Sequence, residues 1–492
     1  MAKEVVLVQP KAGEYESVGL RTPDSLLSIA AIPFQKGYMI KIIDQRTDKD
    51  WKLHLKQHLN SAVCVGVTSM TGPQIGYALE ISKFVKENSN VPVVWGGVHA
   101  SLLPEQTLSN KYIDIVVKGE GDYTLYELLL ALEKQRNNPA KNYLQKVKGI
   151  YYKKNKLIKK TAERPLIDNL DELPNLPYDL IDMNDYYGFT ISPGKSITLM
   201  TSRGCPFRCT FCYNTLYYKN KWRGMSAEKT VERIKYVIDK FGVKNIYFQD
   251  DNFCANIERF KKIVELILKE KIDVKWGLLG TRIDSLKYMD DEFLKKVVKA
   301  GCINIDVGIE SGSQRVLDII SKGTRMQDVI QVNKKIAKYF TRIKYTFIMG
   351  VPTETEKELM ESVHFAIRLC KDNPHVLPLF NIFFINPGTA IYNTAIRHGY
   401  KEPKRLEDWA RTGRGGEYKK YPWLSKKTIK MMENFEFTSF FVTKNIDYKI
   451  NKAFLRFLMR LYRPIAKYRF EHNFYHFLIE KKLSGLLTRG AR

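Results

Sequence analysis

The sequence predicts an α/β protein with a doubly wound parallel sheet, a partial (β/α)6 barrel and a basic helical C-terminal region. Three observations support this fold class. Short apolar strands alternate with helices of about ten to twelve residues over the first 135 residues. A second alternating series begins at residue 197, after a stretch rich in Asn, Lys, Pro and Tyr. From residue 401 onward the pattern is helical, basic and aromatic.

The domain boundaries are predicted from these changes of pattern. A chain of 492 residues is too long for one ordinary domain, and an apolar fraction of 44% is enough for more than one core. We expect the doubly wound domain over residues 1–140, a connector over 141–190, the partial barrel over 191–400 and the helical region over 401–492.

The first domain is predicted to contain five strands and three helices. The strands are residues 5–8, 39–44, 62–68, 92–95 and 113–117, and the helices are residues 25–35, 76–87 and 124–135. Strands separated by helices of this length form parallel sheets covered on both faces. In the connector, residues 173–177 (LPNLP) cannot be helical because each proline restricts its predecessor, and residues 149–159 are predicted to form a small hairpin.

The second series contains six strand–helix units. Its strands are predicted at 197–202, 244–249, 274–279, 303–309, 343–349 and 380–385, and its helices at 226–240, 256–270, 290–300, 312–321, 326–339 and 354–371. In barrels of this kind the active groups lie at the carboxyl ends of the strands.

Composition limits the compartment and the partners. No apolar run reaches 18 residues, the N-terminus lacks a signal-peptide layout, and cysteines are sparse, so we expect a cytoplasmic protein without disulfides. The net charge is +27, of which +13 falls in residues 401–492. Such a surface favours nucleic acid, anionic lipid or phosphorylated substrates, although solubility alone or a salty or acidic interior explains it equally well.

Three of the seven cysteines, Cys205, Cys209 and Cys212, lie within eight residues on a loop after the first barrel strand. Thiolates bind zinc, copper(I) or iron–sulfur clusters. A structural zinc site normally has four protein ligands, and no further Cys or His lies within forty residues on either side. Three thiolates on one loop instead favour a four-iron cluster with one iron left open for a chelating substrate.

The spacing C-x3-C-x2-C, with Phe211 before the last cysteine, resembles the signature of the radical S-adenosylmethionine (SAM) superfamily. The resemblance implies a [4Fe-4S] cluster on Cys205, Cys209 and Cys212 whose open iron binds SAM. One electron from an external flavodoxin-like or ferredoxin-like donor then cleaves SAM to methionine and a 5′-deoxyadenosyl radical. The protein positions and tunes these cofactors, and no catalytic side chain is identified.

Motifs at the ends of later strands resemble SAM-contacting segments of this superfamily. Asp250 or Asp251 would accept a hydrogen bond from the SAM ammonium, with a solvated acidic turn as the alternative, and Arg282 would pair with the SAM carboxylate. Glu310 stands on an otherwise apolar strand and so needs a polar partner, unless it is solvated at the barrel mouth. The full set of expected SAM contacts is Phe211, Asp250, Asp251, Arg282, Glu310, Ser311, Gly350 and Pro352.

The first domain resembles the Rossmann-like cobalamin-binding domains fused to radical SAM barrels, through residues 66–75 (GVTSMTGPQI), 95–104 (WGGVHASLLP) and 118–122 (KGEGD). The resemblance implies cobalamin contacts from Thr68, Ser69, Met70, Thr71, Gly96, Gly97, His99, Gly119, Glu120 and Gly121. The Asp-x-His-x-x-Gly motif that supplies an axial histidine elsewhere is absent, so His99 is expected to contact at most the nucleotide tail. A nucleotide-binding or ligand-free sheet is the alternative.

Residues 441–470 carry eight Lys or Arg and one acidic residue, interleaved with aromatic residues. Apolar residues at 454, 457, 458 and 461 share one helical face. The sequence favours packing of this face on the barrel as a lid, with peripheral contact to an anionic membrane as the alternative.

We expect a cobalamin-dependent radical SAM enzyme that methylates an unactivated carbon of a small-molecule or lipid substrate through methylcobalamin. A cyclase, oxidase or carbon–carbon coupling enzyme acting on a tetrapyrrole or membrane lipid is the first alternative. RNA modification is a lesser one, because the first 204 residues contain only Cys64 and so lack the extra cluster cysteines of the methylthiotransferases. A non-catalytic cobalamin carrier is disfavoured by the cysteine loop.

Overall fold

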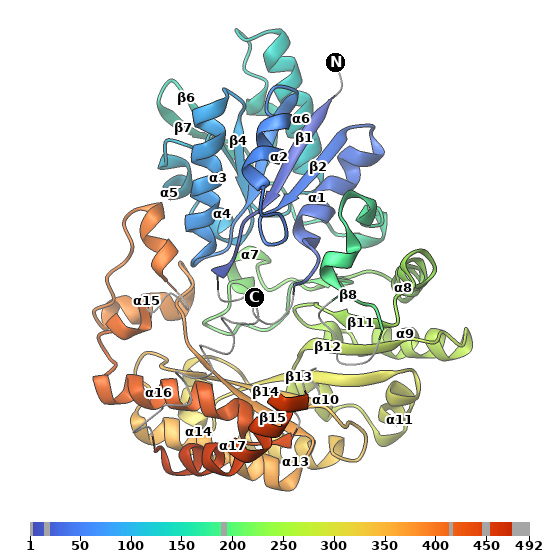
Figure 1. Cartoon of the computed structure of the whole chain (residues 1–492), viewed down its shortest axis with the longest axis vertical. Helices are drawn as coiled ribbons and strands as arrows, with labels where there is room; N and C mark the ends of the chain where they lie inside the picture. Colours follow the sequence, from blue (N-terminus) through green and yellow to red (C-terminus); the bar gives the residue numbers. More distant parts are fainter. Residues whose placement is uncertain (1–2, 14–19, 188–193, 413–416, 445–452, 475–492) are drawn as a thin grey trace. The chain divides into compact units, whose positions relative to one another are not determined.

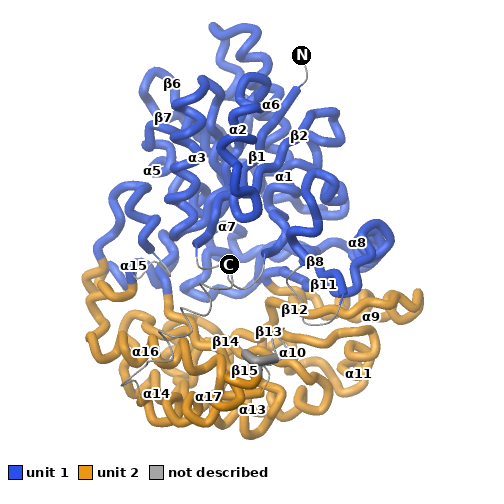
Figure 2. Tube along the Cα trace, viewed as in Figure 1, with its two compact units in different colours: residues 1–251, 384–396, 401–417 blue, residues 252–383, 397–400, 418–492 orange. Residues whose placement is uncertain are grey.

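The computed structural model describes residues 3–13, 20–187, 194–412, 417–444 and 453–474, with the backbone alone for 453–456. The chain forms two compact units (Figure 2). Unit 1 comprises residues 1–251, 384–396 and 401–417, and unit 2 comprises residues 252–383, 397–400 and 418–492. The predicted barrel series is therefore divided between the units after its second strand.

Unit 1 contains a seven-stranded sheet with the strand order β2-β1-β3-β4-β5-β6-β7 (Figure 1). The strands are β1 (Glu4–Gln9), β2 (Met39–Asp44), β3 (Ala62–Thr68), β4 (Val93–Gly96), β5 (Ile115–Val117), β6 (Ile150–Lys154) and β7 (Leu157–Lys160). The first five strands run parallel, and the predicted hairpin, β6 and β7, extends the sheet antiparallel beside β5. Every residue of β1 is buried, as in a strand covered on both faces.

Helices cover both faces of this sheet. They are α1 (Asp24–Gln35), α2 (Trp51–His58), α3 (Gln74–Asn88), α4 (Val98–Leu102), α5 (Pro104–Ser109) and α6 (Asp122–Asn137). Helix α1 packs against α6, and α2 packs against α3. Because β2 and β3 lie on opposite sides of β1, the winding direction reverses there, and right-handed crossovers place these two pairs on opposite faces. The carboxyl ends of β1 and β3 thus border the crevice where doubly wound sheets bind ligands.

Unit 1 also contains the start of the barrel series. Parallel strands β8 (Ser196–Leu199) and β11 (Asn245–Phe248) are joined through β9 (Ser202–Arg203), α7 (Asn214–Tyr217), β10 (Arg223–Gly224) and α8 (Ala227–Phe241). Strands β9 and β10 pair antiparallel and close the loop that carries the three clustered cysteines. A later segment returns to this unit with α15 (Ala390–Arg397) and a short 3-10 helix (Leu406–Arg411) that packs on α3.

Unit 2 is built on four parallel strands in the order β12-β13-β14-β15: Lys275–Thr281, Cys302–Glu310, Ile343–Met349 and Val376–Ile382. Its helices are α9 (Ile257–Lys269), α10 (Ile283–Lys287), α11 (Asp291–Lys299), α12 (Gln314–Ile319), α13 (Met326–Ile336), α14 (Glu356–Asp372), α16 (Lys426–Thr438) and α17 (Ala453–His472). Strands followed by amphipathic helices confirm the second α/β series, and α16 and α17 confirm a helical C-terminal region.

Two predictions about this unit were wrong. The last strand was expected at 380–385 but runs from Val376 to Ile382. Pro378 made its first half look unlike a strand, yet β15 ends the strand order, where a missing N–H donor is tolerated. The second concerns α17. Its expected packing face contains Phe457 and Leu461, which are 57% and 59% exposed.

The face of α17 that packs is a different one. It contains Met459, Ala466 and Phe470, and the Phe470 ring lies 5.2 Å from Phe380 and 5.6 Å from Phe435. A helix with apolar residues on two faces has two possible packing sides, and the periodicity alone did not distinguish them. The side chain at 454 lies outside the described residues. Within the described chain, no helix is both long enough and apolar enough to span a bilayer.

Candidate functional site

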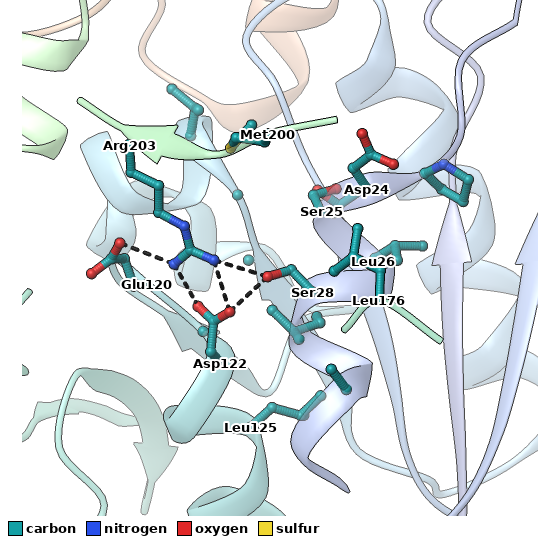
Figure 3. Close-up of a pocket in the computed structure, with 18 of the residues that line it drawn as sticks. Asp24, Ser25, Leu26, Ser28, Glu120, Asp122, Leu125, Leu176, Met200 and Arg203 are labelled. Carbon is teal, nitrogen blue, oxygen red and sulfur yellow. Dashed lines mark hydrogen bonds and ion pairs between the residues drawn. The ribbon is translucent and has the colours of Figure 1, made fainter. Parts of the chain in front are cut away.

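A cavity of about 470 Å³ lies within unit 1 (Figure 3). One part of its wall consists of loops at the carboxyl ends of β1, β3, β4 and β5 together with the start of α1. A second part is formed by residues 200–203, which lead from β8 into the cysteine loop, and by tyrosines of that loop. Residues 170–176 of the connector also contribute to the lining. The cavity is therefore at the reversal point of the sheet and is bounded by the segment that precedes Cys205.

Most of the predicted cobalamin contacts line this cavity. The lining includes Thr68, Met70, Gly96, Gly97, Gly119, Glu120 and Gly121, whereas Ser69, Thr71 and His99 are not part of it. Gly97 is required by the local geometry, because its φ is +94° and an added Cβ would lie 2.6 Å from the carbonyl oxygen of Ser69. The loops after β3 and β4 can therefore approach each other only with glycine at this position.

His99 is completely buried and does not line the cavity. Its Nδ1 lies 3.0 Å from the Thr71 hydroxyl, and its ring contacts Trp409 edge to face at 5.6 Å. Burial lowers the pKa of His99 to about 3, so the imidazole is neutral. The Nε2 atom has no hydrogen-bond partner among the described residues. A role for His99 at the cobalamin nucleotide tail remains a prediction.

A buried ion network beside the cavity was not found by sequence reasoning. Arg203 donates to Glu120 at 3.0 Å and to both carboxylate oxygens of Asp122 at 2.9 Å (Figure 3). Burial disfavours charge on Asp122, but Arg203 outweighs it and lowers the pKa of that carboxyl. The only local signal was an arginine two residues before the first clustered cysteine.

The three clustered cysteines lie on the loop between β9 and β10. Cys209 is buried, Cys205 and Cys212 are half-buried, and the Cys212 amide donates to the Cys209 carbonyl at 3.1 Å. Burial raises the pKa of Cys212 to about 12, so a bound cation is needed to stabilise its thiolate. Within the described chain, no three His, Cys, Asp or Glu side chains are arranged around one point as ready-made metal ligands.

Both predicted carboxylates after β11 hold the backbone that leads into the cysteine loop. Asp250 accepts hydrogen bonds from the Thr201 amide at 3.1 Å and from the Ser202 hydroxyl at 2.5 Å. Asp251 accepts one from the Gly204 amide at 2.9 Å. Burial raises the pKa of Asp251, although hydrogen bonds from Asn214 and Gly204 oppose the shift. The solvated acidic turn considered above is therefore excluded for Asp250, which is 3% exposed.

Asp24 is a second cavity-lining group that the sequence did not reveal. It accepts hydrogen bonds from the hydroxyls of Thr22 at 2.5 Å and Thr198 at 3.0 Å. Burial raises the pKa of Asp24 to about 6, even though both hydrogen bonds favour the charged form. An aspartate in the first turn of a helix is common for electrostatic reasons, so nothing nearby marked it as functional.

In unit 2, Lys322 joins two of the predicted SAM residues. It forms an ion pair with Glu310 at 2.7 Å, and its carbonyl accepts a hydrogen bond from Arg282. Arg282 also pairs with Asp284 at 2.7 Å. The Glu310 and Lys322 side chains are 11% and 5% exposed, so Glu310 is not solvated at the barrel mouth. Ser311, the next residue, is buried with its hydroxyl 3.2 Å from that of Ser362.

The predicted turn at Gly350 and Pro352 is held by a buried carboxyl. Glu354 accepts hydrogen bonds from the amides of Gly350 at 2.6 Å and Val351 at 3.3 Å. Burial raises the pKa of Glu354 to about 8 despite these hydrogen bonds. Gly350 has a φ of +85°, and its carbonyl accepts a hydrogen bond from Trp423 at 3.0 Å.

Comparisons with known proteins identify the family. The model of the radical SAM superfamily matches residues 199–366, and the model of the B12 binding domain matches residues 16–129. A relative from Pyrococcus horikoshii named "Uncharacterized methyltransferase PH0819" is 33% identical over 96% of this chain and 94% of its own length. The chain belongs to the cobalamin-binding radical SAM enzymes.

Two further proteins are similar to this radical SAM enzyme. The anaerobic magnesium-protoporphyrin IX monomethyl ester cyclase of Cereibacter sphaeroides is 29% identical over 74% of this chain and 59% of that protein. The structure of the cobalamin-dependent radical SAM enzyme OxsB, solved with aqua-cobalamin and SAM bound, matches with a TM-score of 0.73 at 19% identity. It covers 96% of this chain and 72% of that chain, and at such identity it shows a shared fold.

Family membership confirms the predicted fold class, the enzymatic nature of the chain and its cofactors: a [4Fe-4S] cluster, SAM and cobalamin. Radical SAM enzymes also require a reductant. The residues fit these groups chemically. Three thiols on one loop are the expected donors to a cluster iron, and a glycine-rich cavity wall permits close approach of a large cofactor. The individual contacts remain predictions.

Replacement of Gly204 is expected to disrupt the cluster loop of this radical SAM enzyme. Gly204 has a φ of +83°, and an added Cβ would lie 2.1 Å from the Lys221 carbonyl oxygen. Gly204→Ala should therefore displace the backbone next to Cys205, at a strain of about 1–3 kcal/mol. After anaerobic reconstitution, its iron content should fall well below that of the wild type.

Gly242→Ala is the matched control for this variant. Gly242 has a similar φ of +64°, but nothing lies within 4 Å of an added Cβ. It should retain iron at the wild-type level. Normal iron content in Gly204→Ala would contradict the close approach of Gly204 to the Lys221 carbonyl.

The half-buried Asp24 carboxyl should make stability depend on pH. Its folded-state pKa of about 6 is above the ordinary 3.8, so the folded chain binds the proton more tightly and loses this stability as pH rises from about 4 to 6. Asp24→Asn removes the titration. The melting temperature of the variant minus that of the wild type should therefore increase between pH 4.5 and 6 and stay level above pH 7.

Asp239→Asn, at an exposed position on α8, is the control for Asp24→Asn. The melting temperature of this variant minus that of the wild type should not increase between pH 4.5 and 6. A pH-independent difference for Asp24→Asn would show that the carboxyl is not buried in the folded protein.

Proposed function

We propose that this radical SAM enzyme is a cobalamin-dependent methyltransferase that methylates an unactivated carbon of a small-molecule or lipid substrate. One observation supports it most directly. A single cavity is bounded both by the predicted cobalamin loops and by the segment entering the cysteine loop, so a cobalamin and the cluster loop would share one reaction space. The name of the Pyrococcus horikoshii relative supports methyl transfer in particular.

The proposed roles follow the predicted sites. Cys205, Cys209 and Cys212 hold the cluster, and Thr68, Gly97 and Gly119 with their neighbours surround the cobalamin. The remaining expected contacts are Phe211, Asp250, Asp251, Arg282, Glu310, Ser311, Gly350 and Pro352 for SAM, and Ser69, Met70, Thr71, Gly96, His99, Glu120 and Gly121 for cobalamin. We assign cobalamin binding to the domain over 1–140 and SAM cleavage to the domain over 191–400.

The chain's own residues organise this chemistry. When bound, the cluster supplies the electron that cleaves SAM, and the cobalamin carries the methyl group. Asp250 and Asp251 fix the backbone on the N-terminal side of Cys205 through Thr201, Ser202 and Gly204. Asp24, with a pKa of about 6, can hold or release a proton at its carboxyl oxygen within the cavity near neutral pH. The electron is supplied by a flavodoxin-like or ferredoxin-like partner.

A second candidate is a cyclase, oxidase or carbon–carbon coupling enzyme acting on a tetrapyrrole or membrane lipid. The similarity to the magnesium-protoporphyrin cyclase over 74% of this chain favours it. The two candidates differ in the fate of the SAM methyl group, because only a methyltransferase moves it to the cobalamin and then to an acceptor.

The test uses the full chain, reconstituted anaerobically with iron, sulfide and hydroxocobalamin, and SAM carrying a deuterated methyl group. With a reductant, we expect 5′-deoxyadenosine together with deuterium label in the extracted cobalamin and in a product from cell extract. Mass spectrometry measures both. Formation of 5′-deoxyadenosine without transfer of label would favour the cyclase candidate. Cys205→Ala, the control, should still bind cobalamin when it is supplied in excess and should form no 5′-deoxyadenosine.

We also propose a peripheral membrane contact through α17. Phe457, Leu461, Ile465 and Tyr468 are each more than half exposed and follow helical spacing, so they form one apolar stripe. The basic Arg460 and Lys467 are exposed on the same helix. An apolar stripe accompanied by cations matches the surface of an anionic bilayer, where each basic residue adds about 1 kcal/mol. A lipid substrate would be reached from that surface.

Co-sedimentation with vesicles tests this contact. The wild type should bind vesicles containing phosphatidylglycerol and bind pure phosphatidylcholine vesicles several-fold more weakly. The double variant Phe457→Ser, Leu461→Ser should lose most of this binding. Leu53→Ser, at a site with 60% exposure on α2, is the matched control and should bind normally. Equal binding by the wild type and the double variant would exclude the stripe as the contact.

A further inference from the structure

A buried set of charges connects the cysteine loop to a cobalamin loop (Figure 3). The Arg203 guanidinium uses one terminal nitrogen to donate to Glu120 at 3.0 Å and to Asp122 at 2.9 Å. It uses the other to donate to Asp122 and to the Ser28 hydroxyl, both at 2.9 Å. The planar fork of arginine fits this bidentate arrangement, and the ammonium of lysine could not reproduce it.

A second arginine completes the set. Arg223 donates to the two carboxylate oxygens of Glu120 at 3.1 and 2.8 Å and to the Ile167 carbonyl at 2.7 Å. The four charged side chains are between 3% and 13% exposed, and their formal charges cancel. We refer to Arg203, Arg223, Glu120, Asp122 and Ser28 as the Arg203 clamp. Loss of one of the four charged members would leave a net buried charge, which is strongly unfavourable.

The cysteine loop is attached to the same cobalamin loop at its other end. Tyr217, five residues after Cys212, donates from its hydroxyl to the Gly119 carbonyl at 2.8 Å. Arg203, before the cysteines, and Tyr217, after them, thus both contact residues 119–122. These residues line the cavity and include three of the predicted cobalamin contacts, Gly119, Glu120 and Gly121.

We propose that the Arg203 clamp and Tyr217 make cobalamin binding and cluster assembly mutually dependent. Ligation of iron by the cysteines fixes the loop between Arg203 and Tyr217, and both residues transmit that order to the loop that surrounds the cobalamin. A ligand binding to a loop that is already ordered loses less conformational entropy, so each cofactor strengthens binding of the other. Thermodynamic linkage requires the two effects to be equal. This inference rests on the proposed cluster and cobalamin sites.

The experiment measures the Kd of hydroxocobalamin by absorbance for the full chain with and without the reconstituted cluster. In the wild type, the cluster should lower Kd by a factor of about five or more, the usual lower end of allosteric coupling. In return, cobalamin should raise the chelator concentration that removes half of the iron. Two variants weaken the connection with minimal disruption: Arg203→Lys keeps the charge, and Tyr217→Phe removes one hydroxyl. In both variants, the Kd without the cluster divided by the Kd with the cluster should fall toward one.

Tyr112→Phe, a half-buried tyrosine just before β5 in unit 1, is the control and should keep the wild-type ratio. A merely structural clamp would weaken cobalamin binding equally with and without the cluster and leave the ratio unchanged, which would overturn the inference. A wild-type ratio near one would overturn it as well. Absence of cobalamin binding in both states would instead reject the proposed cobalamin site itself, and this inference with it.

Discussion

The buried pairing of Arg203 with Asp122 and Glu120 is the interaction on which the site in unit 1 depends. Two arginines and two carboxylates have been removed from water next to a cavity, and their mutual pairing offsets part of the desolvation cost. Among the described residues, Nε and Nη2 of Arg223 have no hydrogen-bond partner. Apolar residues could fill the same space without this desolvation cost. The charges instead specify one arrangement of two loops that are separated by about eighty residues in the sequence.

The strand order explains why these loops are available. In unit 1 the sheet reverses its winding between β1 and β3, so the loops after β1, β3, β4 and β5 surround one crevice. Strand β8 delivers residues 200–203 to that cavity wall, and the cysteine loop follows at once. Because the carboxyl ends of parallel strands lie at one edge of a sheet, the glycine-rich cavity wall and the segment entering the cysteine loop come together through ordinary strand–loop connections.

Local patterns in the sequence predicted most of the strands and longer helices but not the contacts between them. The strands at 39–44, 62–68 and 343–349 were predicted to the residue, because apolar runs bounded by turn residues are local signals. The addition of β6 and β7 to the first sheet and the pairing of Arg203 with Asp122 each join distant segments, which no local period encodes. The expected packing of the α17 face with Phe457 and Leu461 was wrong for a related reason: periodicity identifies a face but not its partner.

Three carboxyls removed partly or fully from water show how the surroundings set the pKa of chemically similar groups. Arg203 holds the pKa of Asp122 below its usual range, whereas burial outweighs the weaker attraction of nearby arginines and raises the pKa of Asp24 to about 6 and that of Glu354 to about 8. Asp122 is therefore a permanent charge that serves structure. Asp24 faces the cavity and titrates near neutral pH. A structural ion pair does not need a carboxyl that changes its protonation state in this pH range. Because hydrogen bonds from Thr22 and Thr198 oppose its raised pKa, burial must be the dominant effect, and a cofactor that excludes further water from the cavity would raise that pKa again.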